Sequence, residues 1–288
     1  MPRLRKSWIT LGVMTAVILA LAAWIQLHPA QKTERRTPIS TLTPSAAHEL
    51  RLERPDKPTL EMGRKDGQWR LTAPFAARAE PAQVERLLSV LTATAELTLP
   101  AVDLARFELE HPRARLTIDG QPFGFGTVNP LTGNVYVLSG KRVFLLEPKY
   151  AGVFPADPNA AIDRRLLASG EAPVSFVFPQ FQVRQEEGNW RVTPVDAELS
   201  QDDLLRWVEG WRLASALRAE PYDGPAPAAH ITIGLRDGRH IPIGVTEHEG
   251  ELAFTRYDEH VRYYFFGNSA RRLLAPPSIT PPGATARR

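Results

Sequence analysis

The chain contains no cysteine among its 288 residues. This absence excludes disulfide bonds, thiolate nucleophiles and cysteine-ligated zinc sites, and it leaves the redox compartment of the protein undecided. An excess of one charge is also lacking, because 35 lysines and arginines against 32 aspartates and glutamates give a net charge of only +3. Since no basic stripe interleaved with aromatic residues occurs either, a nucleic-acid partner is not expected.

The sequence motifs of several common enzyme classes are missing as well. No GxSxG, SxxK or HExxH motif occurs, and the seven histidines are scattered along the chain. The glycine-rich stretch FGFGTVNPLTGN (residues 123–134) departs from GxGxxG at Asn129, and we interpret it as a hairpin loop rather than a phosphate cradle. We therefore expect a non-enzymatic protein with no catalytic residue and no cofactor.

The first feature that is present is a candidate membrane anchor. The basic residues Arg3, Arg5 and Lys6 precede an uncharged, mostly apolar run over residues 7–27. A helix of about 20 residues matches a bilayer core about 30 Å thick. Because basic residues favour the cytoplasmic side, we predict a single-pass membrane protein with residues 1–28 as its anchor, its N-terminus in the cytoplasm and the remainder on the other side of the membrane.

A cleavable signal peptide is the alternative interpretation of this segment, because ALAAW offers small residues suited to cleavage near Ala22. The apolar run continues beyond that site and exceeds a usual signal-peptide core, which favours the uncleaved anchor. Residues 29–46 are rich in proline, threonine and charge, and residues 277–288 are rich in proline. We expect a tether over the first range and a disordered tail over the second.

One phrase occurs twice, as DGQWRLTAP at residues 66–74 and as EGNWRVTP at residues 187–194. Trp69 and Trp190 are 121 positions apart (190 − 69), and each phrase is followed by a predicted helix with apolar residues at helical spacing. The expected core of the two copies consists of Trp69, Val84, Leu87, Leu88 and Leu91, and of Trp190, Leu204, Trp207, Val208 and Trp211. Tryptophans also stack on sugar rings in glycan sites, but their place on the apolar period favours core packing.

Short stretches with apolar residues at every second position surround each helix, and glycine or asparagine separates them. Strands grouped around one longer helix, without strand–helix alternation, predict an α+β fold with mainly antiparallel sheets. We expect two tandem related units at residues 47–168 and 169–276. Each would pack its sheet with one longer helix and a short terminal helix.

The combination of anchor, tether, DGQWRLTAP, AEPAQVERLLSVL and IDRRLLA before the second copy resembles the bacterial domain-of-unknown-function 4340 family. The likeness covers roughly residues 48–276. It implies an envelope protein outside the cytoplasmic membrane, in some cases associated with components of ABC-type transporters. It implies no catalytic residue, because the family has no defined active site.

Two groups of charged residues are candidates for a site. The segment from residue 245 to 265 contains acids and histidines that could meet across strands, and the weak metal-ligand candidates are Glu247, His248, Asp258 and His260. A solvated polar face is the favoured interpretation, because no fixed ligand spacing occurs. Asp163, Arg164 and Arg165 lie between the two copies, where we expect interdomain ion pairs; an anion site is the alternative.

These observations favour a non-enzymatic accessory component of a membrane complex, such as an ABC-type transporter, which binds or holds another envelope protein. A glycan or peptidoglycan binding module is the second hypothesis, and a hydrolase is a remote third. An exposed aromatic groove would favour the glycan hypothesis, and carboxylates converging in a deep pocket would favour the enzyme.

Overall fold

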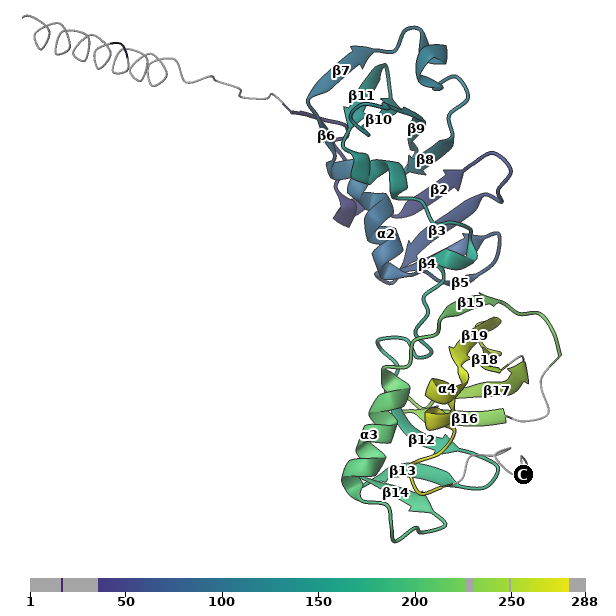
Figure 1. Cartoon of the computed structure of the whole chain (residues 1–288). Coiled ribbons are helices and arrows are strands. Elements are labelled where there is room, and N and C mark those ends of the chain that lie inside the picture. Colours follow the sequence, from purple (N-terminus) through teal and green to yellow (C-terminus); the bar gives the residue numbers. More distant parts are fainter. Residues whose placement is uncertain (1–16, 18–35, 226–229, 249, 280–288) are drawn as a thin grey trace, which may run out of the picture.

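The structure is a computed structural model that describes residue 17 and residues 36–225, 230–248 and 250–279. Two antiparallel sheets follow one another along the chain, the first in purple to teal and the second in green to yellow (Figure 1). The α+β class with mainly antiparallel sheets is thereby confirmed. The predicted anchor, residues 7–27, lies outside the described residues apart from Val17, and within the described part no helix is long and apolar enough to cross a bilayer.

Among the described residues, the first sheet has nine strands in the order β5-β4-β3-β2-β8-β9-β10-β11-β7, and every neighbouring pair is antiparallel. The strands are β2 (Glu49–Glu53), β3 (Leu60–Lys65), β4 (Gln68–Ala73), β5 (Ala77–Arg78), β7 (Leu97–Pro100), β8 (Ala114–Ile118), β9 (Gln121–Val128), β10 (Val135–Ser139) and β11 (Arg142–Leu146). Alternating burial, as in β2 and β10, gives the sheet one face turned to the core.

The second sheet has eight described strands in the order β14-β13-β12-β16-β17-β18-β19-β15, again antiparallel throughout. They are β12 (Pro173–Val177), β13 (Gln182–Glu186), β14 (Asn189–Thr193), β15 (Arg218–Pro221), β16 (His230–Leu235), β17 (His240–His248), β18 (Glu251–Arg256) and β19 (Val261–Phe266). If β5 is set aside, the strands of the two sheets correspond one to one in spatial order. The order β4-β3-β2-β8-β9-β10-β11-β7 in the first sheet matches β14-β13-β12-β16-β17-β18-β19-β15 in the second.

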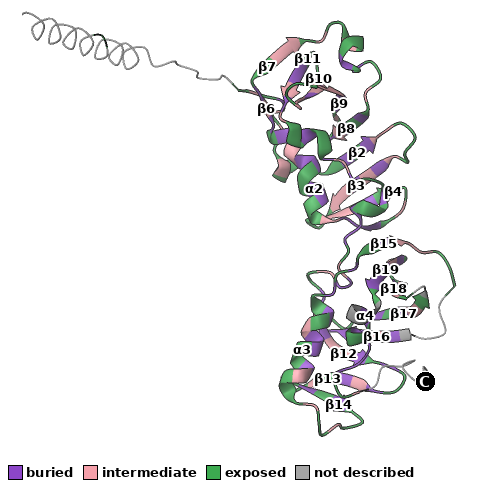
Figure 2. Cartoon of the chain, viewed as in Figure 1, coloured by how far each residue is buried: buried purple, intermediate pink, exposed green. Residues whose placement is uncertain are grey.

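Helices cover the core face of each sheet. The structure contains α2 (Pro81–Leu88), which continues as the 3₁₀ helix η2 (Ser89–Thr92), then α3 (Gln201–Arg212) and α4 (Gly267–Leu274). Proline suits the first turn of α2, and Ser200 forms a capping box with Asp203 at the start of α3. Buried residues lie on the faces of α2 and α3 that turn toward the strands (Figure 2).

Short 3₁₀ helices complete the described fold: η1 (Pro44–Ala46), η3 (Leu104–Phe107), η4 (Pro148–Gly152) and η5 (Asn159–Ala161). After its last strand, the first unit continues through the 3₁₀ helices η4 and η5, and the second through α4. Trp211 is fully buried, and its Nε1 donates a hydrogen bond of 3.0 Å to the carbonyl of Leu273 in α4. One continuous hydrophobic cluster contains residues of both units.

Both ends of the folded part extend further than the sequence predicts. Residues 36–46 were expected in the tether, yet β1 (Thr37–Pro38) pairs with β6 (Thr94–Ala95), and Ile39 is buried. Residues 277–279 were expected in the tail, yet Ile279 packs against the core. In both cases an isolated isoleucine within a polar segment contacts the core, which composition alone does not reveal.

Candidate functional site

The weak metal candidates are not brought together. Glu247 lies near the end of β17, whereas Asp258 and His260 lie in the turn after β18. Glu247 is paired near the start of β18, and Asp258 follows the end of β18. Because a strand rises about 3.3 Å per residue, the six residues of β18 separate the two positions by about 20 Å. The side chain of His248 is outside the described part. Glu247 instead pairs with Arg271 at 3.3 Å, and it does not share a site with Asp258.

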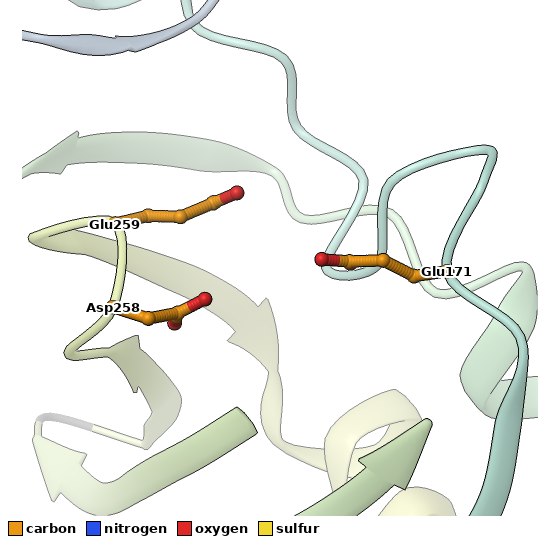
Figure 3. Close-up of side chains that lie close together, drawn as sticks. All are labelled: Glu171, Asp258 and Glu259. Carbon is orange, nitrogen blue, oxygen red and sulfur yellow. The ribbon is translucent and has the colours of Figure 1, made fainter. Parts of the chain in front are cut away.

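Asp258 belongs to a different cluster, together with Glu171 and Glu259. The three carboxylates point toward one another from the turn after β18 and from the segment before β12 (Figure 3), and their oxygen atoms lie within 4.8 Å of one another. Such a group would suit a divalent cation. However, the guanidinium of Arg256 lies among them, with its nitrogens 2.7 Å from Glu171 and 2.6 Å from Asp258. Arg256 therefore supplies the positive charge that these carboxylates need.

A second buried arginine joins this cluster to the first sheet. Arg78 at the end of β5 is 6% exposed, and its Nε lies 2.9 Å from Glu259 Oε1. Its Nη1 lies 3.1 Å from Asp163, and its Nη2 donates a hydrogen bond of 2.9 Å to the hydroxyl of Tyr263 in β19. Arg78 thus connects an edge strand of the first unit with the linking segment and with the second unit. We call Arg78, Asp163, Glu171, Arg256, Asp258, Glu259 and Tyr263 the junction network.

The linking segment, residues 162–166, is also held by its backbone on both sides. Asp163 N–H donates to the carbonyl of Arg78 at 2.8 Å, and Leu166 N–H donates to the carbonyl of Ala214 at 2.9 Å. The carbonyl of Leu166 accepts hydrogen bonds from Arg78 at 3.4 Å and from Arg256 at 3.0 Å. One short segment therefore forms hydrogen bonds with both units.

Burial and pairing have opposite effects on the charges of the junction network. Burial alone would lower the pKa of Arg256, but hydrogen bonds to Glu171 and Asp258 raise it above the usual value. Burial alone would raise the pKa of Glu171, but the hydrogen bond and the charge of Arg256 hold it below the usual value. Burial raises the pKa of the Tyr263 hydroxyl. Both ions of the Arg256–Glu171 pair are therefore charged at neutral pH.

Interdomain ion pairs were expected for Asp163, Arg164 and Arg165, and the structure shows them only in part. Asp163 is buried and accepts from Arg78, and Arg165 pairs with the same carboxylate at 2.9 Å. Arg164 is exposed and donates to the carbonyl of Leu217 at 3.4 Å; no carboxylate among the described residues lies within ion-pair distance of it. The central arginines, Arg78 and Arg256, were missed. The available signal in the sequence concerned Arg256, which follows Leu252 and Phe254 at every second position of an apolar strand and therefore shares their face.

Of the ten residues expected in the repeat core, one is not fully buried. Nine are buried in the structure: Val84, Leu87, Leu88, Leu91, Trp190, Leu204, Trp207, Val208 and Trp211. Trp69 is only partly buried. It lines a cavity of about 420 Å³ between β4, α2 and the linking segment, together with Arg64, Val84 and Arg165. Hence the two equivalent-looking tryptophans have different environments.

A family model described as Domain of unknown function (DUF4340) matches residues 69–220. The match covers more than half of the chain and includes most of β4, the linking segment and α3. No curated protein and no solved structure matches the chain.

Proposed function

Because the chain belongs to the DUF4340 family, whose description assigns no function, we propose on structural grounds that it is a rigid, non-enzymatic scaffold of the bacterial envelope. Residues 7–27 would anchor it in the inner membrane, with the N-terminus in the cytoplasm and both sheets in the periplasm. The sheets would hold or bind another component of a membrane complex, such as an ABC-type transporter.

The junction network is the observation that carries this proposal. Arg78 and Arg256 are both buried, and their guanidinium groups are surrounded by carboxylates and carbonyl oxygens from two units and the linking segment. A buried arginine held by several acceptors is costly to expose, because its partners would remain buried without compensation. This arrangement favours a fixed geometry between the two units, which a scaffold requires and independent modules do not.

We also propose that the two units are copies of one ancestral unit. The shared order of eight strands supports this, as do the equivalent turns at Asp66–Gly67 and Glu187–Gly188, where all four residues have positive φ. Asp66 and Glu187 have φ angles of 51°, a region that few non-glycine residues adopt. Two copies joined rigidly would present two related surfaces at a fixed distance from the membrane.

Site-specific crosslinking in intact membranes tests the scaffold function. The natural chain has no cysteine, so Leu131→Cys and Val195→Cys place single thiols on the two units, at side chains that are 93% and 88% exposed. With a photo-activated thiol reagent on the periplasmic side, we expect labelling at both positions and capture of a membrane-complex component from at least one. Recovery of the chain alone from both positions, despite full labelling, would contradict the scaffold; failure of labelling would contradict the topology.

Glycan binding remains the second candidate, and one observation favours it. Trp69 is partly exposed at a cavity, as an aromatic platform for a sugar ring would be. No comparable observation favours the hydrolase.

A further inference from the structure

The cavity beside Trp69 differs from the equivalent place in the second unit. Trp69 in β4 pairs across the strands with Arg64 in β3, and Trp190 in β14 pairs with Gln185 in β13. Trp190 is 6% exposed and lies 6.1 Å from the ring of Phe176. No ring contact of Trp69 is found within the described ranges. The same position in two similar sheets is therefore filled by core in one unit and borders a cavity in the other.

The start of the following helix explains part of this difference. In the second unit, Gln201 at the start of α3 accepts a hydrogen bond of 3.1 Å from the N–H of Trp190 and donates one to its carbonyl. This side chain satisfies the backbone of the edge strand β14 at Trp190 and ties the start of α3 to that strand. In the first unit α2 starts with Pro81, which has no such side chain, and the carbonyl of Trp69 accepts from Ala79 N–H at 3.1 Å. The space that Gln201 and α3 close in the second unit stays open beside Trp69.

The walls of the cavity divide into an apolar part and a polar rim. Trp69, Val84 and Leu88 form the apolar part. Arg64, Glu85 and Arg165 contribute charges to the rim, and Arg78 and Asp163, which pair with each other, also line the cavity. A volume of about 420 Å³ lies within the range of small-molecule sites, roughly 300–1,000 Å³. An indole beside several hydrogen-bonding side chains suits a sugar ring, whose C–H face packs on the indole while its hydroxyl groups reach polar side chains.

Arg64 determines the charge of the ligand. Its Nη1 donates to the carbonyl of Ser45 at 2.8 Å and its Nε to the carbonyl of Gly67 at 3.4 Å, so the guanidinium is held at the rim. No carboxylate within the described part of the chain forms an ion pair with it. Arg165, by contrast, pairs with Asp163. An arginine fixed by carbonyl oxygens and without an acidic partner is suited to bind a carboxylate.

We propose that this cavity binds a sugar ring that carries a carboxylate, with Trp69 as the stacking platform and Arg64 as the carboxylate ligand. Glu85 is exposed and accepts from a sugar hydroxyl. This inference rests on the second candidate function, glycan binding, and is independent of the scaffold. It also accounts for the difference between the units, because Gln185 in place of Arg64 and a covered Trp190 remove both elements of the site from the second unit.

Calorimetric titration of the full chain in detergent tests the proposal. The probes are digalacturonate, its neutral counterpart galactobiose, and inorganic phosphate. We expect saturable binding of digalacturonate at one site and binding of galactobiose that is weaker by about tenfold or more, because the charge-assisted hydrogen bond to Arg64 is lost. Phosphate should bind no more tightly than galactobiose.

The variant Arg64→Gln gives the first unit the residue that pairs with tryptophan in the second, and we expect it to weaken digalacturonate binding about tenfold while galactobiose binding stays unchanged. Arg184→Gln, at an exposed position of β13 outside the cavity, is the matched control and should bind as the natural chain does. Trp69→Ala, checked by its melting curve, should abolish binding of both sugars.

Four results would overturn the proposal. If neither sugar binds, both this inference and the glycan candidate are wrong. If galactobiose binds as tightly as digalacturonate, or if Arg64→Gln has no effect, the cavity binds sugars but the carboxylate assignment is wrong. If phosphate binds as tightly as digalacturonate, the site recognises an anion and not a sugar.

Discussion

The two units place the same residue in two different environments. The sequences around Trp69 and Trp190 are similar, and the two tryptophans lie on corresponding strands, although β5 pairs with β4 in the first sheet and β14 is an edge strand of the second. Yet Trp190 is a core residue beneath α3, and Trp69 borders a cavity. The difference arises outside the phrase, at the helix start and at the cross-strand neighbour. Burial of a side chain is therefore decided by what covers it, and not by the local sequence that carries it.

Replacing each tryptophan by alanine measures this difference. We expect Trp190→Ala to lower the free energy of unfolding by about 3–5 kcal/mol, the usual cost of deleting a buried large aromatic side chain. Trp69→Ala should cost about half as much, because a partly exposed ring loses less contact and leaves no closed cavity. Urea denaturation followed by circular dichroism provides the measurement. Equal losses in the two variants would show that Trp69 is as much a core residue as Trp190.

The second prediction concerns the connection between the units. Arg78→Ala removes the side chain that joins β5 to Asp163, Glu259 and Tyr263, and it leaves two carboxylates and the tyrosine hydroxyl buried without this partner. We expect a loss of about 3 kcal/mol, at the lower end of the cost of breaking a buried ion pair. Limited digestion with an arginine-specific protease should then cut at Arg165 faster than in the natural chain.

Arg184→Ala serves as the control for this change, because it removes an exposed arginine from β13. It should leave both stability and digestion unchanged. If the natural chain itself is rapidly cut at Arg164 or Arg165 into two stable halves, the units are independent and the rigid-scaffold proposal fails.

The smallest expected effect is a dependence of stability on pH. The folded-state pKa of Glu171 lies below its unfolded value of about 4.3, because Arg256 outweighs the effect of burial. The carboxylate therefore contributes its full stabilisation above about pH 4.3, and this contribution is lost as the pH falls through the folded-state pKa. Denaturation midpoints at pH 7, 5, 4 and 3.5 should fall more steeply for the natural chain than for Glu171→Gln. Parallel curves would contradict the assigned role of Glu171.

Local patterns predicted the strands and helices well for a physical reason. Alternating residues such as Leu50 and Leu52, and helical spacing such as Leu204, Trp207 and Val208, report which face of an element meets the core. The junction network could not be predicted in this way. Arg78 meets Asp163 and Glu259 across 85 and 181 positions of sequence, and no local pattern encodes such pairs. The cavity escaped prediction because it depends on the pairing register of Arg64 with Trp69.

The shared carbonyl of Leu166 sets a limit on engineering. A single oxygen accepts from Arg78, which lies in the first unit, and from Arg256, which lies in the second. Insertion or deletion of one residue between Ile162 and Leu166 would move this oxygen by about 3 Å and leave at least one guanidinium unmatched. Chimeras that exchange one unit for that of another protein should therefore keep this segment at its natural length and include both arginines.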